Sequence, residues 1–173
     1  DLPLKRMVQS PIALMQQITF WVTNMPAPLM AGKRGLIMGL ANDKSIAWGI
    51  AKALADHGAT LAFSYQGEAL KKRVDPLAAE VGSTEVIECD VSDEASLDAL
   101  FAHLKSIWGS LDFVVHAIGF SDKNELRGRY VDTSAANFRM TMDISVYSFT
   151  AVCQRACAMM PDGGSLLTLT YYG

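Results

Sequence analysis

The chain has 173 residues, of which 50% are hydrophobic and 19% are charged, and its formal net charge is −3. This length indicates one domain, and this composition excludes a disordered chain. The slightly acidic balance excludes a basic surface for nucleic acid or anionic membrane, and no apolar run reaches the ~20 residues that span a bilayer. Three cysteines and three scattered histidines indicate neither a disulfide framework nor a zinc site, so we expect a cytoplasmic protein without bound metal.

Residues 1–28 differ in composition from the rest of the chain. They hold two basic residues and no glycine, and Gln16 and Gln17 interrupt their apolar stretch. A signal peptide or a transit peptide is the weaker interpretation, because no small-residue cleavage motif follows and serine and arginine are sparse. We therefore expect a disordered N-terminal extension at residues 1–28 and one folded domain at residues 29–173.

From residue 33 onward, short apolar runs alternate with segments in which apolar residues recur at helical spacing. The apolar runs predict strands at residues 35–40, 60–65, 84–89, 111–117 and 165–170. The helical spacing predicts helices at residues 46–57, 68–81, 93–108 and 134–160. Strands that alternate with helices of this length indicate βαβ units. The predicted fold class is therefore α/β, with a doubly wound parallel sheet of the Rossmann type.

Two of the predicted helices have features of their own. Pro76 should kink or restart the helix at residues 68–81. The helix at residues 134–160 is apolar on more than one face, which places it in the core or at a subunit interface.

The predicted sheet is one strand short of the six-stranded doubly wound sheet. Its fifth strand would be an exposed apolar edge, which is an aggregation hazard for a free monomer. We therefore expect the chain to be a fragment of a longer protein, truncated before the last strands, or to depend on a partner.

The loop after the first strand carries Gly39, Ser45, Ile46 and Gly49. It departs from the G-x-G-x-x-G pattern, yet it still leads into a helix whose first N–H groups can bind a pyrophosphate. Ser45 adds a hydroxyl at the cap position, and Gly49 permits close packing of the helix on the strand. An ordinary strand–helix turn with Ser45 as the N-cap explains the spacing equally well.

Polar residues follow the second and third strands, at the edge of the sheet where this fold binds ligands. Gln66 can contact ribose hydroxyls, but without a carboxylate or an arginine the spacing does not decide between NAD and NADP. Asp90 can accept from an adenine amino group, and Val91 can pack on the ring. A polar turn residue at Gln66 and a helix-capping role for Asp90 are the structural alternatives.

The later strands supply fewer candidates. Gly119 lets the backbone approach a ligand closely, whereas we expect His116 to be a packed, hydrogen-bonded core residue. We expect Cys153 and Cys157 to fill the core rather than to bind metal. Tyr171 follows the fifth strand, where its hydroxyl can bond a substrate carbonyl or its ring can pack under the next loop.

Motifs at the strand ends, taken in order, resemble one family. They are Gly39-x5-Ser45-Ile46-Ala47-x-Gly49, Tyr65-Gln66, Cys89-Asp90-Val91, His116-Ala117-Ile118-Gly119-Phe120 and Leu167-Thr168-Leu169-Thr170-Tyr171. Together they resemble bacterial enoyl-[acyl-carrier-protein] reductases, a divergent branch of the short-chain dehydrogenase/reductases. The resemblance runs from Met30 to Gly173. A reductase that acts on a ketone is a competing interpretation, although Asn-Asn-Ala-Gly would be its usual sequence after the fourth strand.

The resemblance implies NADH as the cofactor and assigns roles to the residues that match. The pyrophosphate would be held by Gly39, Ser45 and Ile46. The adenosine would be held by Gln66 at the ribose and by Asp90 and Val91 at adenine. The nicotinamide ribose would be bordered by Ile118 and Gly119.

The resemblance also implies a reaction, the NADH-dependent reduction of the trans-2 double bond of an enoyl thioester on acyl carrier protein in fatty-acid biosynthesis. Phe120 and Ser121 would touch the acyl substrate, and Tyr171 would be catalytic. The family has a second active-site tyrosine and a lysine that would lie past Gly173. A non-catalytic nucleotide-binding fragment is therefore a further interpretation of this chain, and the family resemblance implies a homotetramer.

Overall fold

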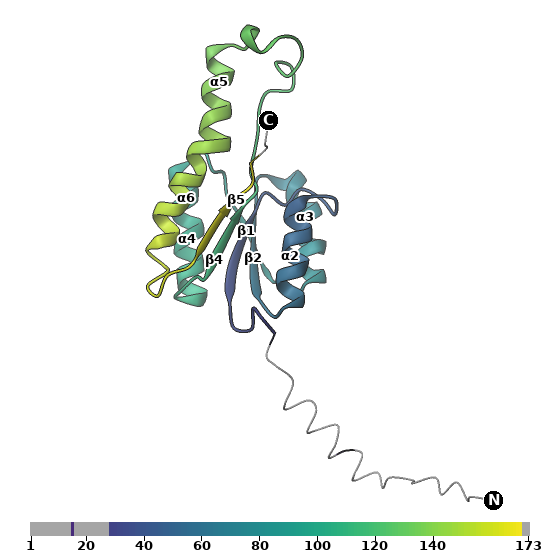
Figure 1. Ribbon diagram of the computed structural model, residues 1–173, viewed down its shortest axis with the longest axis vertical. Helices are drawn as coiled ribbons and strands as arrows, with labels where there is room; N and C mark the ends of the chain where they lie inside the picture. The colour runs from purple at the N-terminus through teal and green to yellow at the C-terminus, as the bar shows by residue number, and fades with distance from the viewer. Residues whose placement is uncertain (1–14, 16–27, 171–173) are drawn as a thin grey trace, which may run out of the picture.

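The computed structural model describes residue 15 and residues 28–170 (Figure 1). Within that part of the chain, no helix is both long enough and apolar enough to cross a membrane. Nearly all of the predicted extension lies outside the described residues, as does Tyr171, so the expectations for both stay predictions.

Among the described residues, five strands form one parallel sheet in the order β3-β2-β1-β4-β5. Their bounds are β1 Arg34–Met38, β2 Thr60–Tyr65, β3 Glu85–Glu88, β4 Phe113–His116 and β5 Ser165–Thr168. The chain runs outward from β1 to β3 and then crosses to β4 on the other side of β1. Ligands of such sheets bind at this reversal, beyond the carboxyl ends of the strands. The predicted doubly wound parallel sheet is confirmed.

Helices cover both faces of the sheet (Figure 1). The helical elements are α2 Ile46–Asp56, α3 Glu68–Glu80, α4 Glu94–Trp108, the 3-10 turn η1 Tyr130–Asp132, α5 Ala135–Met142, the π-helical turn η2 Asp143–Tyr147 and α6 Ser148–Cys157. Helices α2 and α3 pack on one face, and α4 and α6 pack on the other. Helix α5 extends beyond the carboxyl ends of the strands.

The core lies in two layers because successive strand residues point to opposite faces of the sheet. In β1, Leu36 and Met38 pack with α4 and α6, whereas Ile37 packs with α2 and α3. Gly35 in the same strand leaves no room for a side chain, since a Cβ there would lie 1.9 Å from the ring of Phe113 on β4. This close packing brings together the two strands that flank the reversal in strand order.

The helix predicted over residues 134–160 is instead two α-helices joined by the π turn η2, and α6 ends at Cys157. Directly after the turn, the hydroxyl of Ser148 at the start of α6 donates to the carbonyl oxygen of Ile144 in the turn at 2.7 Å. Such a side-chain bond competes with the backbone ladder of the helix. Apolar spacing could not reveal the turn, because a π turn widens only one turn of an otherwise α-helical pattern.

Smaller differences lie at the element boundaries. Helix α3 continues through Pro76 instead of restarting there, because the proline is exposed and water can reach the carbonyl that loses its partner. Four of the strands are shorter than the apolar runs that predicted them. Leu40 shows the reason, since it is buried although β1 has already ended at Met38. An apolar run in a sequence predicts which residues are buried, but it does not predict where the hydrogen-bonded pairing of a strand ends.

Candidate functional site

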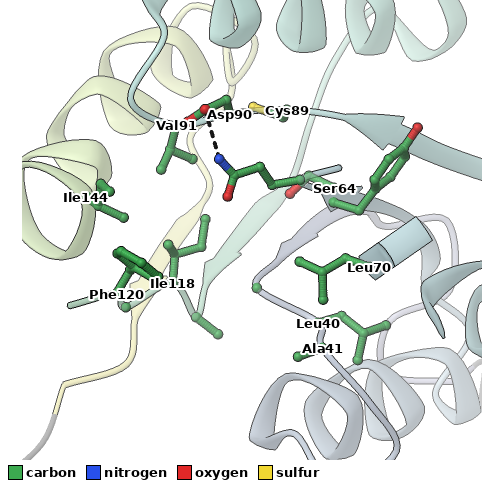
Figure 2. Close-up of a pocket in the computed structure, with 15 residues that line it drawn as sticks. Leu40, Ala41, Ser64, Leu70, Cys89, Asp90, Val91, Ile118, Phe120 and Ile144 are labelled. Carbon is green, nitrogen blue, oxygen red and sulfur yellow. Dashed lines mark hydrogen bonds between the residues drawn. The ribbon is translucent and has the colours of Figure 1, made fainter. Parts of the chain in front are cut away.

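A cavity of about 290 Å³ opens where the carboxyl ends of β1, β2, β3 and β4 meet (Figure 2). The predicted site residues that line it are Gly39, Gln66, Asp90, Val91, Ile118, Gly119 and Phe120. Ser45 and Ile46 lie on an adjoining hollow that also contains Gly39, Ile118 and Gly119. The fold therefore gathers every predicted cofactor residue at the reversal between β1 and β4.

Gly39 brings the end of β1 against the end of β4. Its φ is +88°, which is a left-handed conformation that L side chains rarely adopt. A Cβ at this position would lie 2.1 Å from the carbonyl oxygen of Ala117. Only glycine fits here, and the close approach shapes the floor of both hollows.

Ser45 stands at the N-cap of α2, but its side chain does not cap the helix. Its hydroxyl oxygen instead accepts hydrogen bonds from the backbone N–H groups of Ala41 at 3.2 Å and Asn42 at 3.1 Å. The hydroxyl therefore stabilises the loop between β1 and α2. Because it does not cap the helix, the first backbone N–H groups of α2 are available to bind an anion. The capping alternative is wrong for the side chain.

Gly49 does not have the packing role predicted for it. It is exposed on α2, and a Cβ built there would meet nothing within 4 Å. The close packing of helix on strand comes instead from Ala47 and Ala51, which are buried on the inner face of α2.

Gln66 and Asp90 are hydrogen-bonded to each other across the cavity wall. The Nε2 of Gln66 donates to Oδ2 of Asp90 at 2.8 Å, and this bond is the dashed line in Figure 2. The backbone N–H and the hydroxyl of Ser92 donate to Oδ1 at 2.9 Å and 2.7 Å. The hydroxyl of Ser92 holds the pKa of the Asp90 carboxyl below its ordinary value.

The helix cap that follows β3 is Asp93 and not Asp90. The Oδ1 of Asp93 accepts from the backbone N–H of Ala95 at 3.0 Å at the start of α4. The carboxylate of Asp90 therefore does not cap α4. It stays on the cavity wall beside Val91, where both can meet a ligand.

His116 is fully buried at the end of β4, as predicted for a packed core residue. Its Nε2 lies 2.8 Å from the hydroxyl of Ser148, and its Nδ1 lies 3.2 Å from the hydroxyl of Thr168. Because Ser148 donates its proton to a carbonyl oxygen, it accepts from Nε2–H, and Nδ1 then accepts from Thr168. Burial lowers the pKa of His116 below its ordinary value, so the neutral ring joins β4 to β5 and α6.

Hydrogen bonds with α5 and η2 hold the substrate candidates Phe120 and Ser121. The hydroxyl of Ser145 accepts from the backbone N–H of Phe120 at 3.0 Å and donates to its carbonyl oxygen at 3.2 Å. The Ser121 hydroxyl contacts the hydroxyl of Thr141 at 2.9 Å and accepts from the amide of Asn137 at 3.2 Å. Phe120 lines the cavity and is 55% exposed.

Sequence reasoning missed Ile144, which lines the cavity, and Ser145, which holds its rim. Both lie inside the predicted helix at residues 134–160, which its apolar spacing places in the core or at a subunit interface. A signal was present in the spacing of Asn137, Thr141 and Ser145, which are polar residues four apart in an apolar helix. Four-residue spacing places such residues on one face of a helix.

The cysteines are only partly as predicted. Cys89 is buried beside the cavity, and burial raises the pKa of its thiol to about 11. Cys153 is half-buried, but Cys157 is exposed on the last turn of α6, so its predicted place in the core is wrong. Within residues 28–170, no three His, Cys, Asp or Glu side chains converge as a metal site.

Comparison with known proteins identifies relatives of this chain. Residues 39–173 match the family described as Enoyl-(Acyl carrier protein) reductase. The chain is 66% identical over 145 residues to enoyl-[acyl-carrier-protein] reductase [NADH] 1 of Rhizobium meliloti, covering 84% of this chain and 53% of that relative. The chain thus spans about half the length of the curated relatives it matches.

Solved structures agree with the sequence comparison. Enoyl-(acyl-carrier-protein) reductase from Anaplasma phagocytophilum, in complex with NAD, is 58% identical with a TM-score of 0.82, covering 85% of this chain and 56% of that one. The Bacillus cereus enoyl-acyl carrier protein reductase, with NADP+ and indole naphthyridinone, is 42% identical with a TM-score of 0.80, covering 83% of this chain and 57% of that one. By sequence motif, fold and similarity, the chain belongs to the enoyl-(acyl carrier protein) reductase family.

Proposed function

We propose that this chain carries the cofactor-binding half of an NADH-dependent enzyme. The enzyme reduces the trans-2 double bond of an enoyl thioester on acyl carrier protein, a step of fatty-acid biosynthesis. The observation that best supports this proposal is the gathering of all the cofactor candidates at the β1–β4 reversal. Membership of the reductase family supports an enoyl thioester over a ketone as the substrate.

The two hollows suit a dinucleotide. The start of α2 offers backbone N–H groups to a pyrophosphate, and Gly39 lets the backbone approach it closely. Gln66 offers a hydrogen-bond acceptor to the ribose, and Asp90 offers one to adenine. The apolar side chain of Val91 suits the face of a ring. The residues that we assign to the cofactor are Gly39, Ser45, Ile46, Gln66, Asp90, Val91, Ile118 and Gly119.

NADH, when bound, supplies a hydride to the β-carbon of the enoyl thioester. Negative charge would then collect on the thioester oxygen until the α-carbon takes up a proton from solvent water. A donor aimed at that oxygen lowers the barrier by about 3 kcal/mol. We assign this donor to the hydroxyl of Tyr171, and we assign the border of the acyl chain to Phe120 and Ser121.

We also propose that the protein is a cytoplasmic homotetramer, without nucleic-acid or membrane partners. A run of exposed apolar side chains on α5 and η2, here called the outer stripe, supports self-association. Its residues, with their exposed fractions, are Phe138 at 47%, Met142 at 42%, Val146 at 52% and Tyr147 at 48%. Contiguous apolar patches on a protein surface commonly mark interfaces.

The cofactor assignment is tested by titrating the 173-residue chain with NADH and following the fluorescence of the bound nucleotide. Gly39→Ala should weaken binding roughly tenfold or more, because the new methyl would meet the carbonyl oxygen of Ala117 and shift the cavity floor. Gly49→Ala is the matched control, because its methyl has open space. Circular dichroism checks that both variants fold. Unchanged NADH affinity in Gly39→Ala would contradict the assignment.

The reaction is tested in a chimera that joins residues 28–173 to the carboxyl-terminal part of the Rhizobium meliloti relative. NADH consumption is followed with a short enoyl thioester. Tyr171→Phe should lower kcat/KM roughly tenfold or more with little change in NADH affinity, because one donor to a charged oxygen is lost. Tyr172→Phe is the neighbouring control. Wild-type turnover in Tyr171→Phe would remove that residue from the mechanism, and an inactive chimera would count against the proposed reaction.

A further inference from the structure

The hydrogen bond between Gln66 and Asp90 fixes which end of the Gln66 amide faces a ligand. An ionised carboxylate only accepts hydrogen bonds, so Gln66 must present its Nε2 to Oδ2 of Asp90, at the observed 2.8 Å. An amide carries its oxygen on the arm opposite its nitrogen. Gln66 lines the cavity, and its Oε1 is therefore the atom left to accept from a bound molecule.

The carboxylate that orients Gln66 is itself held in place. Ser92 donates twice to its other oxygen, and the backbone N–H of Asp90 donates to the hydroxyl of Ser96 at 2.9 Å. The hydroxyl of Ser92 also keeps the pKa of Asp90 below its ordinary value, so the carboxyl is ionised at neutral pH. The amide of Gln66 is therefore hydrogen-bonded to a fixed carboxylate, which can only accept hydrogen bonds.

We propose that Asp90 is a positioning residue that selects NADH over NADPH by orienting Gln66, an inference that rests on the proposed function. The 2′-hydroxyl of NADH can donate to Oε1 of the oriented amide. The 2′-phosphate of NADPH carries mainly acceptor oxygens and negative charge. It therefore cannot donate to Oε1 of Gln66, and the negative charge of Asp90 repels it.

The charges around the cavity agree with this selection. Among the described residues that line the cavity, Asp90 is the one with a charged side chain. Lys71 on the neighbouring helix α3 has its ammonium group 2.6 Å from Asp75 and 5.7 Å from the ring centre of Tyr65. This lysine is already paired and leaves the negative charge of Asp90 uncompensated at the cavity.

Family membership does not decide this choice. Among the similar structures, one reductase is in complex with NAD and another with NADP+. The cofactor preference must therefore come from residues within the site. The pair formed by Gln66 and Asp90 is where this chain holds an acceptor and a negative charge together.

The test measures the Kd of the 173-residue chain for NADH and for NADPH by fluorescence titration. Asp90→Asn keeps the shape but allows the Gln66 amide to turn over, so the ratio of the NADPH Kd to the NADH Kd should fall roughly tenfold. Asp93→Asn is the matched control, because it removes a neighbouring carboxylate outside the cavity lining and leaves the Gln66 bond and the charge of Asp90 in place. Its ratio should stay near that of the wild type. A loss of affinity in Asp90→Asn that is equal for both nucleotides would show a merely structural role and would overturn the proposal.

A double-mutant cycle decides whether Asp90 acts through Gln66. Asp90→Asn should change the ratio far less in the Q66A background than in the wild-type background. An equal change in both backgrounds would overturn the proposal, because the carboxylate would then select by its own charge alone and not by orienting Gln66. Wild-type protein that binds neither nucleotide would contradict the proposed function itself, whereas wild-type protein that binds both equally would contradict the selection alone.

Discussion

At the scale of single residues, His116 joins three elements through one neutral ring. It lies on β4 and bonds Thr168 at the end of β5 and Ser148 at the start of α6. The sequence predicted a packed core histidine, because His116 sits within an apolar strand. It could not predict the two hydroxyl partners, which are 52 and 32 residues away along the chain.

Burial of His116 predicts that the fold weakens in mild acid. In the folded protein the pKa of His116 lies below its ordinary value of 6.5. In the pH window just beneath 6.5, the unfolded chain therefore binds a proton at this histidine that the folded chain does not. Stability therefore falls as the pH falls through this window. We expect Tm to drop between about pH 7 and about pH 5, and to drop less in His116→Gln, when followed by calorimetry.

The control for this experiment is the exposed His103 on α4, whose Nε2 lies 2.9 Å from Glu85. His103→Gln removes a partly exposed imidazole and leaves the buried ring of His116 unchanged. It should not flatten the drop in Tm. An equal pH dependence in the wild type and in His116→Gln would contradict the assignment of the drop to His116.

At the scale of elements, a stripe of polar side chains on α5 and η2 forms hydrogen bonds that hold the segment following β4. Asn137 and Thr141 hold Ser121, and Ser145 holds the backbone of Phe120 at both its N–H and its carbonyl oxygen. The segment has no strand partner of its own along this stretch in the described sheet. Its position at the rim of the cavity therefore depends on the helix above it.

Loss of the Ser145 hydroxyl should loosen this rim without unfolding the domain. In Ser145→Ala the backbone groups of Phe120 lose their partner, which costs about 1 kcal/mol locally for each hydrogen bond. We expect amide hydrogen exchange in residues 118–122 to speed up severalfold while global Tm changes little, as measured by mass spectrometry. Ser106→Ala on α4, where an exposed hydroxyl donates to the carbonyl of His103, is the control. Unchanged exchange at residues 118–122 would show that the rim holds without Ser145.

The sequence predicted elements better than their contacts. The predicted helix at residues 93–108 agrees with α4 to within one residue, because Ser92 or Asp93 before it and Gly109 after it are local signals of a helix start and end. In the structure the cap is Asp93. The π turn was not found, because Ile144 and Ser145 fit an α-helical pattern as well as a π turn. The bond between Gln66 and Asp90 depends on strands β2 and β3 lying side by side, which only the folded sheet establishes.

At the scale of the whole molecule, the position of the outer stripe supports the proposed self-association. Helices cover both faces of the sheet, and α5 extends past its carboxyl ends (Figure 1). Phe138 and Met142 of the outer stripe lie on α5, and both are exposed. The apolar spacing of residues 134–160 predicts a helix in the core or at a subunit interface. Its inner residues, such as Val152 of α6, are buried, whereas Val146 and its neighbours in the stripe are not.

A charge placed in the outer stripe should therefore disrupt self-association. Val146 is 52% exposed, and burying a lysine there in a subunit interface would leave an unpaired charge. We expect Val146→Lys to shift the mass measured by light scattering toward the monomer. Val131→Lys is the matched control, since Val131 is 76% exposed on η1, outside the stripe. The stripe would be excluded as the interface if Val146→Lys kept the wild-type mass, or if Val131→Lys dissociated the protein equally well.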